Sequence, residues 1–66
     1  MRYQFVVEQR VSTEVAAELP DMSMTSSPTG GTAVFGPMRD EADVWSMFAR
    51  ISDLGLCVVG VHPLPD

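Results

Sequence analysis

The chain of 66 residues has one cysteine, one histidine and no lysine. A single cysteine cannot form an internal disulfide, and together with one histidine it falls short of the four ligands of a structural zinc site. A chain this short buries only about 60% of its unfolded surface and usually needs further stabilisation. Self-association is the remaining common stabiliser, so we expect a homodimer or a higher homo-oligomer.

Basic residues and long apolar runs are also scarce. The four arginines are scattered, and the net charge of −5 disfavours nucleic acid, whose phosphates require a clustered basic surface. No run approaches the 18 apolar residues that would suggest a transmembrane helix, and the first residues do not resemble a signal peptide. We expect a cytoplasmic protein that binds neither nucleic acid nor membranes.

The clearest structural pattern covers residues 40–61. Asp40 can cap a helix with Asp43 reaching back toward the cap, an apolar stripe recurs at helical spacing through residues 44–54, and Gly55 suits the left-handed residue that ends a helix. Residues 56–61 then read as a strand that is apolar on both faces. This half of the chain predicts a capped helix followed by a strand.

The first half predicts shorter elements. Residues 2–10 alternate as a half-buried strand does, and residues 12–19 form a helix of about two turns that Pro20 ends. Residues 22–26 and 32–35 predict a hairpin around a turn at 28–31, and residues 36–39 leave the sheet. The short first helix is the weakest part of this prediction.

The element order β-α-β-β-α-β favours an α+β fold in which helices cover one face of an antiparallel sheet. Its commonest form is a small ferredoxin-like sandwich with strand order 4-1-3-2. A meander with an irregular first connection is the alternative. We expect residues 1–66 to form a single domain.

Two segments, GPMRDEA at 36–42 and ARISDLGL at 49–56, resemble the C-terminal part of a group of short actinobacterial proteins of unknown function. Members of that group read Gly-Pro, two residues, Asp-Gln-Ala, then Ala-Arg-Ile-Arg-Asp-Leu-Gly-Leu. The resemblance implies a similar second helix with its caps and implies no activity. Many members carry Leu-His-Gly inside the helix, where this chain has Val-Trp-Ser at 44–46, so any chemistry of that histidine is lost here.

Few residues are candidates for chemistry. His62 has no nucleophile or orienting partner near it in the sequence, so a solvated residue is favoured over a general base, although it stays a ligand candidate. Cys57 reads as a small buried hydrophobe. Met22 and Met24 have the spacing of a soft-metal pair, but gap filling under a short helix is favoured.

The acidic residues and the tryptophan of the second helix have two interpretations each. Asp40, Glu41 and Asp43 suit the positive end of the helix dipole better than a divalent cation. Trp45 lies at the edge of the apolar stripe, where packing on the first helix is favoured over a contact with a partner or a ligand. We expect no catalytic residue, no cofactor and no metal.

Strand alternation divides the expected sheet into two faces. Tyr3, Phe5 and Val7 would lie beneath the helices, and the last strand would add Cys57, Val59 and Val61 to that face. The opposite face would then expose an apolar strip, and such strips often mark contact surfaces. The residues expected there are Val6, Val34, Val58 and Gly60.

These features predict a non-catalytic, self-associating protein-interaction module, using the exposed strip or the edge of the last strand. The interface or ligand candidates are Trp45, Val6, Val34, Val58 and His62. The alternative is a small-ligand-binding or accessory enzyme-like domain with a pocket formed between subunits.

Overall fold

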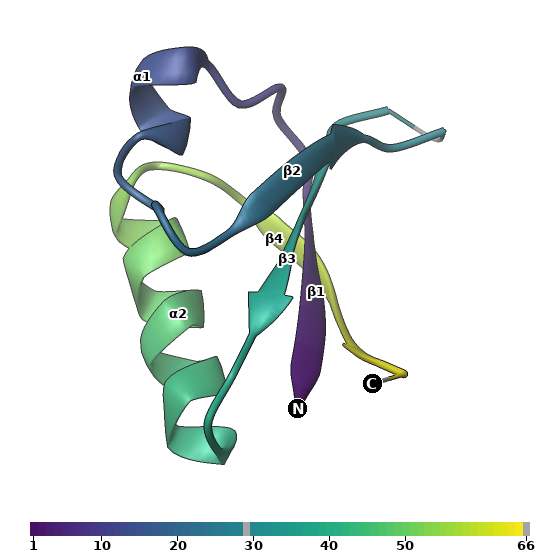
Figure 1. Cartoon of the computed structure of the whole chain (residues 1–66). Coiled ribbons are helices and arrows are strands. Elements are labelled where there is room, and N and C mark those ends of the chain that lie inside the picture. The colour runs from purple at the N-terminus through teal and green to yellow at the C-terminus, as the bar shows by residue number, and fades with distance from the viewer. Residues whose placement is uncertain (29, 66) are drawn as a thin grey trace.

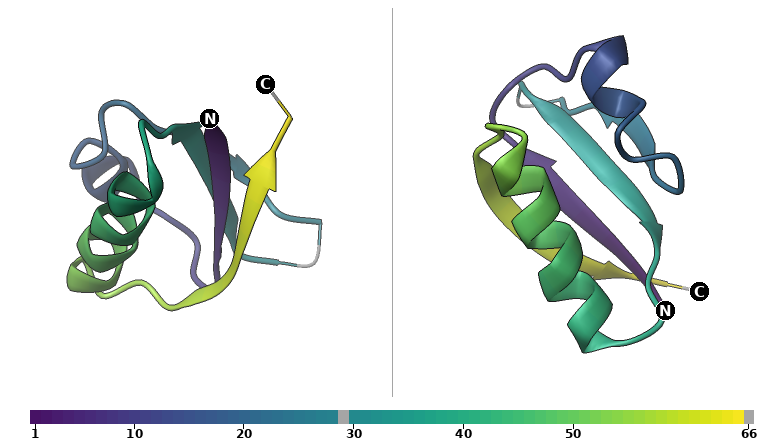
Figure 2. Two further views of the ribbon diagram at one scale, coloured as in Figure 1. Left: turned by 90° about the horizontal axis from the view of Figure 1, so that it is seen from below. Right: turned by 90° about the vertical axis from the view of Figure 1, so that its left-hand side faces the viewer.

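The computed structural model describes residues 1–28 and 30–65. Four strands form one antiparallel sheet in the order β2-β3-β1-β4, and both helices lie on the same side of it (Figures 1 and 2). The chain therefore has an α+β fold. The elements are β1 (Arg2–Val7), α1 (Thr13–Ala16), β2 (Ser23–Ser26), β3 (Thr32–Pro37), α2 (Glu41–Asp53) and β4 (Val58–Leu64).

The core lies between the sheet and α2. Phe5 and Val7 of β1 and Val34 of β3 are fully buried there, because the register places these inward-facing residues beside one another. Ile51 of α2 is also fully buried, and Leu19 reaches the core from the connection between α1 and β2. The core is completed by Val44 and Met38.

Helix α2 begins and ends where the sequence predicts. The Asp40 side chain accepts a hydrogen bond from the amide of Asp43 at 2.9 Å, and Gly55 has a φ of 84° directly after the C-cap Leu54. One difference concerns Asp43, whose carboxylate accepts from the amide of Arg39 at 2.9 Å instead of reaching the amide of Asp40. Two carboxylates therefore stabilise the first turn, and each accepts a hydrogen bond from a different backbone amide.

Helix α1 has a single turn, half of what the sequence suggests. Ser12 caps it by accepting from the amide of Val15. The amides of Glu18, Leu19 and Met22 each bond a carbonyl three residues back, as in a 3₁₀ turn. Pro20 accounts for this, since it disfavours α-helical geometry at the preceding residue, Leu19. The remainder of this crossover between β1 and β2 is an irregular chain (Figure 1).

The hairpin from β2 to β3 closes through hydrogen bonds between Ser27 and the two glycines that follow. Of the predicted turn at 28–31, Thr29 lies outside the described residues. Gly31 has a φ of 77°, and a Cβ atom there would collide with the carbonyl oxygens of Val7 and Glu8. A glycine is therefore required where the hairpin crosses the end of β1.

The expected distribution of side chains on β4 is wrong in part. A β-bulge shifts the register between Val6 and Val7, so Val7 lies opposite Val58 and Val6 lies opposite Gly60. Val58 therefore packs on the core, whereas Val59 is 61% exposed. Cys57 precedes the strand and is exposed, so it is not the buried hydrophobe that was expected.

The expectation for Val34 is also wrong. Its Cα partner on β1 is Phe5, an inward residue, and both side chains are fully buried. Val34 and Val58 thus belong to the helix-covered face and are not exposed on the other one.

Candidate interaction surface

The side of the sheet without helices is called the open face here (Figure 2). It is formed by alternate residues of all four strands, related through the register. Val6 occupies its middle, as the sequence predicts, between Gly60 and Ala33. The outward positions are Arg2, Gln4 and Val6 of β1, Ser23 and Thr25 of β2, Ala33, Phe35 and Pro37 of β3, and Gly60, His62 and Leu64 of β4.

An apolar cluster lies on this face. Val6 and Phe35 are half-buried although neither belongs to the side chains packed on the core, and Ala33 between them is only 6% exposed. These residues are therefore partly shielded from solvent by neighbouring side chains on the same face of the sheet. Strand alternation in the sequence assigned Val34 to this face and did not predict Phe35 there. Adjacent residues of a strand point to opposite faces, so an assignment that is shifted by one residue exchanges the two faces.

Among the residues that the structure describes, no strand residue of the open face carries a carboxylate. Within the strands as the structure bounds them, Arg2 is the one residue charged at neutral pH apart from any charge on His62. Eight of the nine acidic residues lie in helices or connections, and the ninth, Asp66, is outside the described residues. The described strand residues thus add no negative charge to the open face.

His62 lies on this surface. It is exposed, it pairs with Gln4 across the strands, and its ring covers Gly60, where a Cβ atom would approach Nε2 to 2.9 Å. A side chain at position 60 would therefore collide with the imidazole. No nucleophilic or acidic side chain hydrogen-bonds this ring among the described residues.

Trp45 lies on the opposite side of the molecule from the open face. Its side chain is 67% exposed, and its ring contacts Phe48 at a centroid distance of 6.1 Å with a tilt of 58°. The favoured expectation, packing on the first helix, does not account for this exposure. Helix α1 lies near the C-terminal end of α2, whereas Trp45 belongs to the first half of α2 (Figures 1 and 2). Trp45 and the open face are therefore two separate exposed features.

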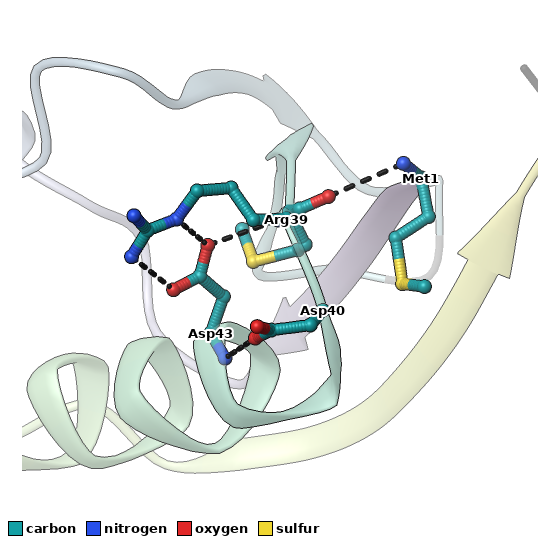
Figure 3. Close-up of polar contacts among 5 residues, drawn as sticks. Met1, Arg39, Asp40 and Asp43 are labelled. Atoms are coloured by element: carbon teal, nitrogen blue, oxygen red, sulfur yellow. Dashed lines mark hydrogen bonds and ion pairs between the residues drawn. The ribbon is translucent and has the colours of Figure 1, made fainter.

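The acidic residues at the start of α2 serve the backbone and one arginine. Arg39 binds the Asp43 carboxylate through Nε at 2.9 Å and Nη2 at 3.0 Å, and Asp40 faces the amide of Asp43 (Figure 3). The side-chain hydrogen bond from Arg39, followed by that from its backbone, lowers the pKa of Asp43 to about 2. In turn, Asp43 raises the pKa of Arg39.

Over residues 1–28 and 30–65, no group of three or more histidine, cysteine, aspartate or glutamate side chains is placed to hold a metal ion. In the same part of the chain, no helix has the length and apolar character needed to cross a membrane.

Comparison with known proteins identifies a family through nearly the whole fold. Residues 2–62, from the first residue of β1 into β4, match the family described as Domain of unknown function (DUF8691). The chain belongs to this family. No curated protein and no solved structure matches the sequence. For a DUF8691 domain, function must therefore be argued from the surfaces described above.

Proposed function

We propose that this DUF8691 domain is a non-catalytic interaction module that self-associates through the open face of its sheet. The observation that carries the proposal is an apolar cluster of Val6, Ala33 and Phe35 on a sheet face that no helix covers. Antiparallel sheets do tolerate one solvated face, but such a face usually alternates to polar residues. Here its centre is apolar, as in a contact surface.

The charge distribution supports a second copy as the partner. Two chains of net charge −5 repel one another unless their carboxylates are kept apart. When two open faces meet, the described strand residues bring no carboxylate into the contact. Desolvation at the contact then involves few charges, which removes the main cost of burying such a surface.

The test is sedimentation equilibrium of the unsubstituted chain and of Val6→Lys. We expect the unsubstituted chain to be a dimer or higher oligomer at micromolar concentration. Val6→Lys places an uncompensated ammonium in the middle of the contact and should give monomers. Val6 replaces Val58 as the position to test, because a lysine at Val58 would enter the core.

Ala49→Lys is the matched control, since Ala49 is an exposed residue of α2 and the substitution adds the same charge on the other side. It should leave the oligomer intact. Trp45→Lys tests the rival contact surface. Monomers from Trp45→Lys with an oligomeric Val6→Lys, or a monomeric unsubstituted chain at high micromolar concentration, would overturn the proposal.

We also propose that the α+β fold is a ferredoxin-like βαββαβ sandwich within a single domain. The support is the strand order β2-β3-β1-β4 with a helix in each of the two crossovers. The one-turn α1 is the departure from that architecture. An experimental structure with a different strand order would contradict this assignment.

A further inference from the structure

A cavity of about 350 Å³ lies beside α2 on the helix-covered side of the sheet. The cavity is open to solvent on one side and is lined by three parts of the chain: the connection after α1 with Asp21 and Met22, the end of β3 with the β3–α2 connection, and one face of α2. This volume is at the lower end of the range for small-molecule pockets, about 300–1,000 Å³. It therefore suits a ligand about the size of one amino acid.

The apolar part of the lining is formed by three methionines, Met22, Met38 and Met47, together with Pro37. Met22 lies against Gly36, where a Cβ atom would approach its sulfur to 2.7 Å, and Met38 is 5% exposed. Methionine side chains are flexible and polarisable, so they adapt to apolar groups of different shape. This part of the cavity can accept a branched or linear aliphatic side chain.

The charged groups of the lining have opposite signs and come from different elements. Arg39 and Asp43 neutralise each other through their two-point contact. Arg50 of α2 and Asp21 of the connection after α1 also line the cavity, and neither makes a hydrogen bond or ion pair through its side chain within residues 1–28 and 30–65. Both residues are solvent-exposed, so among the described residues the cavity offers one unpaired cation and one unpaired anion at its rim, next to an apolar surface.

We propose that this cavity binds a free α-amino acid with an apolar side chain. Arg50, with the Ser46 hydroxyl one turn earlier on the same face of α2, takes the carboxylate. Asp21 takes the ammonium group, and the methionines cover the side chain. A zwitterion satisfies both free charges at once, which a simple carboxylate or amine does not. This site lies within one chain and does not depend on self-association.

The experiment titrates the ¹⁵N-labelled protein with four probes and follows its amide resonances. L-Leucine carries both charges and the apolar group, 4-methylpentanoate lacks the ammonium, 3-methylbutylamine lacks the carboxylate, and glycine lacks the side chain. We expect saturable shifts at residues 21–22 and 46–50 with leucine. Each of the other probes should bind at least about tenfold more weakly, since each loses one charged or apolar contact.

Two variants test the individual charges. Arg50→Gln and Asp21→Asn should each weaken leucine binding by about tenfold, while Arg10→Gln and Glu14→Gln, exposed charges outside the cavity lining, should not. Equal binding of leucine and 4-methylpentanoate would overturn the proposal, as would the absence of saturable shifts or unchanged binding in both cavity variants. If a variant fails to fold, the probe series on the unsubstituted chain decides alone. Sedimentation of Val6→Lys tests self-association separately.

Discussion

The two connections that cross the helix-covered face do the same topological task by different means. The second contains α2, a helix of 13 residues with an aspartate cap at its start and a left-handed glycine after its end. The first contains α1, a helix of four residues without a buried side chain. A helix of one turn has little stability of its own, because helix nucleation is unfavourable. The first crossover must therefore be held by contacts with the rest of the chain.

Those contacts come from residues far away in the sequence. The buried Thr32 hydroxyl accepts a hydrogen bond from the amide of Val11 at 3.2 Å and donates one to the carbonyl of Gln9 at 3.1 Å. The Gln9 side chain in turn bonds the amide of Cys57 at 2.8 Å and the carbonyl of Gly55 at 3.2 Å. The start of the first crossover thus links the hairpin to the end of the second. Local capping builds one crossover, and long-range contacts build the other.

The largest loss of stability is expected from Leu19→Ala, which tests the long-range contacts of the first crossover. Leu19 is 1% exposed and is the fully buried side chain of the first crossover, so truncation should cost roughly 2–5 kcal/mol. A chain of this length has only several kcal/mol in total, and the variant should be largely unfolded at room temperature. Urea denaturation followed by circular dichroism measures this. Val15→Ala, on the half-buried part of α1, should cost clearly less; equal costs would mean that α1 itself stabilises the crossover.

The next effect is expected from Gly31→Ala. Left-handed geometry costs a non-glycine residue about 1–2 kcal/mol, and the collision with Val7 and Glu8 adds about 1–3 kcal/mol of overpacking. Gly30→Ala is the matched control, because Gly30 has a φ of 96° but nothing within 4 Å of a new Cβ atom. Only the first cost applies to it. Similar midpoints of thermal unfolding for the two variants would show that the hairpin does not press on the end of β1.

The difference between local capping and long-range contacts also explains which parts of the fold could be predicted from the sequence. The limits of α2 follow from Asp40, Gly55 and the apolar stripe, all of which act within a few residues of one another. Most of its buried face was predicted for the same reason. The α+β class, with helices on one face of an antiparallel sheet, also follows from the order of these local patterns.

Long-range features were not predictable in this way. The bulge opposite Val6 and Val7 depends on how β4 docks on β1, and it moves Val58 inward without any mark in the local alternation. The lining of the cavity combines Met22, Met38 and Arg50 from separate parts of the chain. Met22 did suggest gap filling under a short helix, but no sequence pattern indicated that Asp21 and Arg50 line one space.

A smaller loss of stability is expected from a substitution at the start of α2, in the second crossover. Asp40→Ala removes the oxygen that accepts the amide of Asp43, and loss of an N-cap costs on the order of 1 kcal/mol. Glu41→Ala is the control, since Glu41 is exposed in the same turn and makes no hydrogen bond with its side chain among the described residues. Denaturant midpoints compare the two. Equal stability of Asp40→Ala and the parent would mean that Asp43 alone is sufficient to start α2.

The smallest effect concerns the Arg39–Asp43 pair and its dependence on pH. Arg39 holds the pKa of Asp43 at about 2, below the ordinary value of 3.8, so the folded state favours the ionised carboxylate. The stabilisation is therefore complete above about pH 4 and is lost as the pH falls toward 2. Because the Arg39 side chain is 87% exposed, solvent and salt weaken the pair.

The stability difference between the parent and Asp43→Asn, measured by urea denaturation at pH 6 and at pH 2, should shrink at the lower pH. The difference removes the contribution of all other titrating groups. It should also decrease in 1 M NaCl at pH 6, whereas a difference that stays constant with both pH and salt would show that the charge of Asp43 does not stabilise the fold.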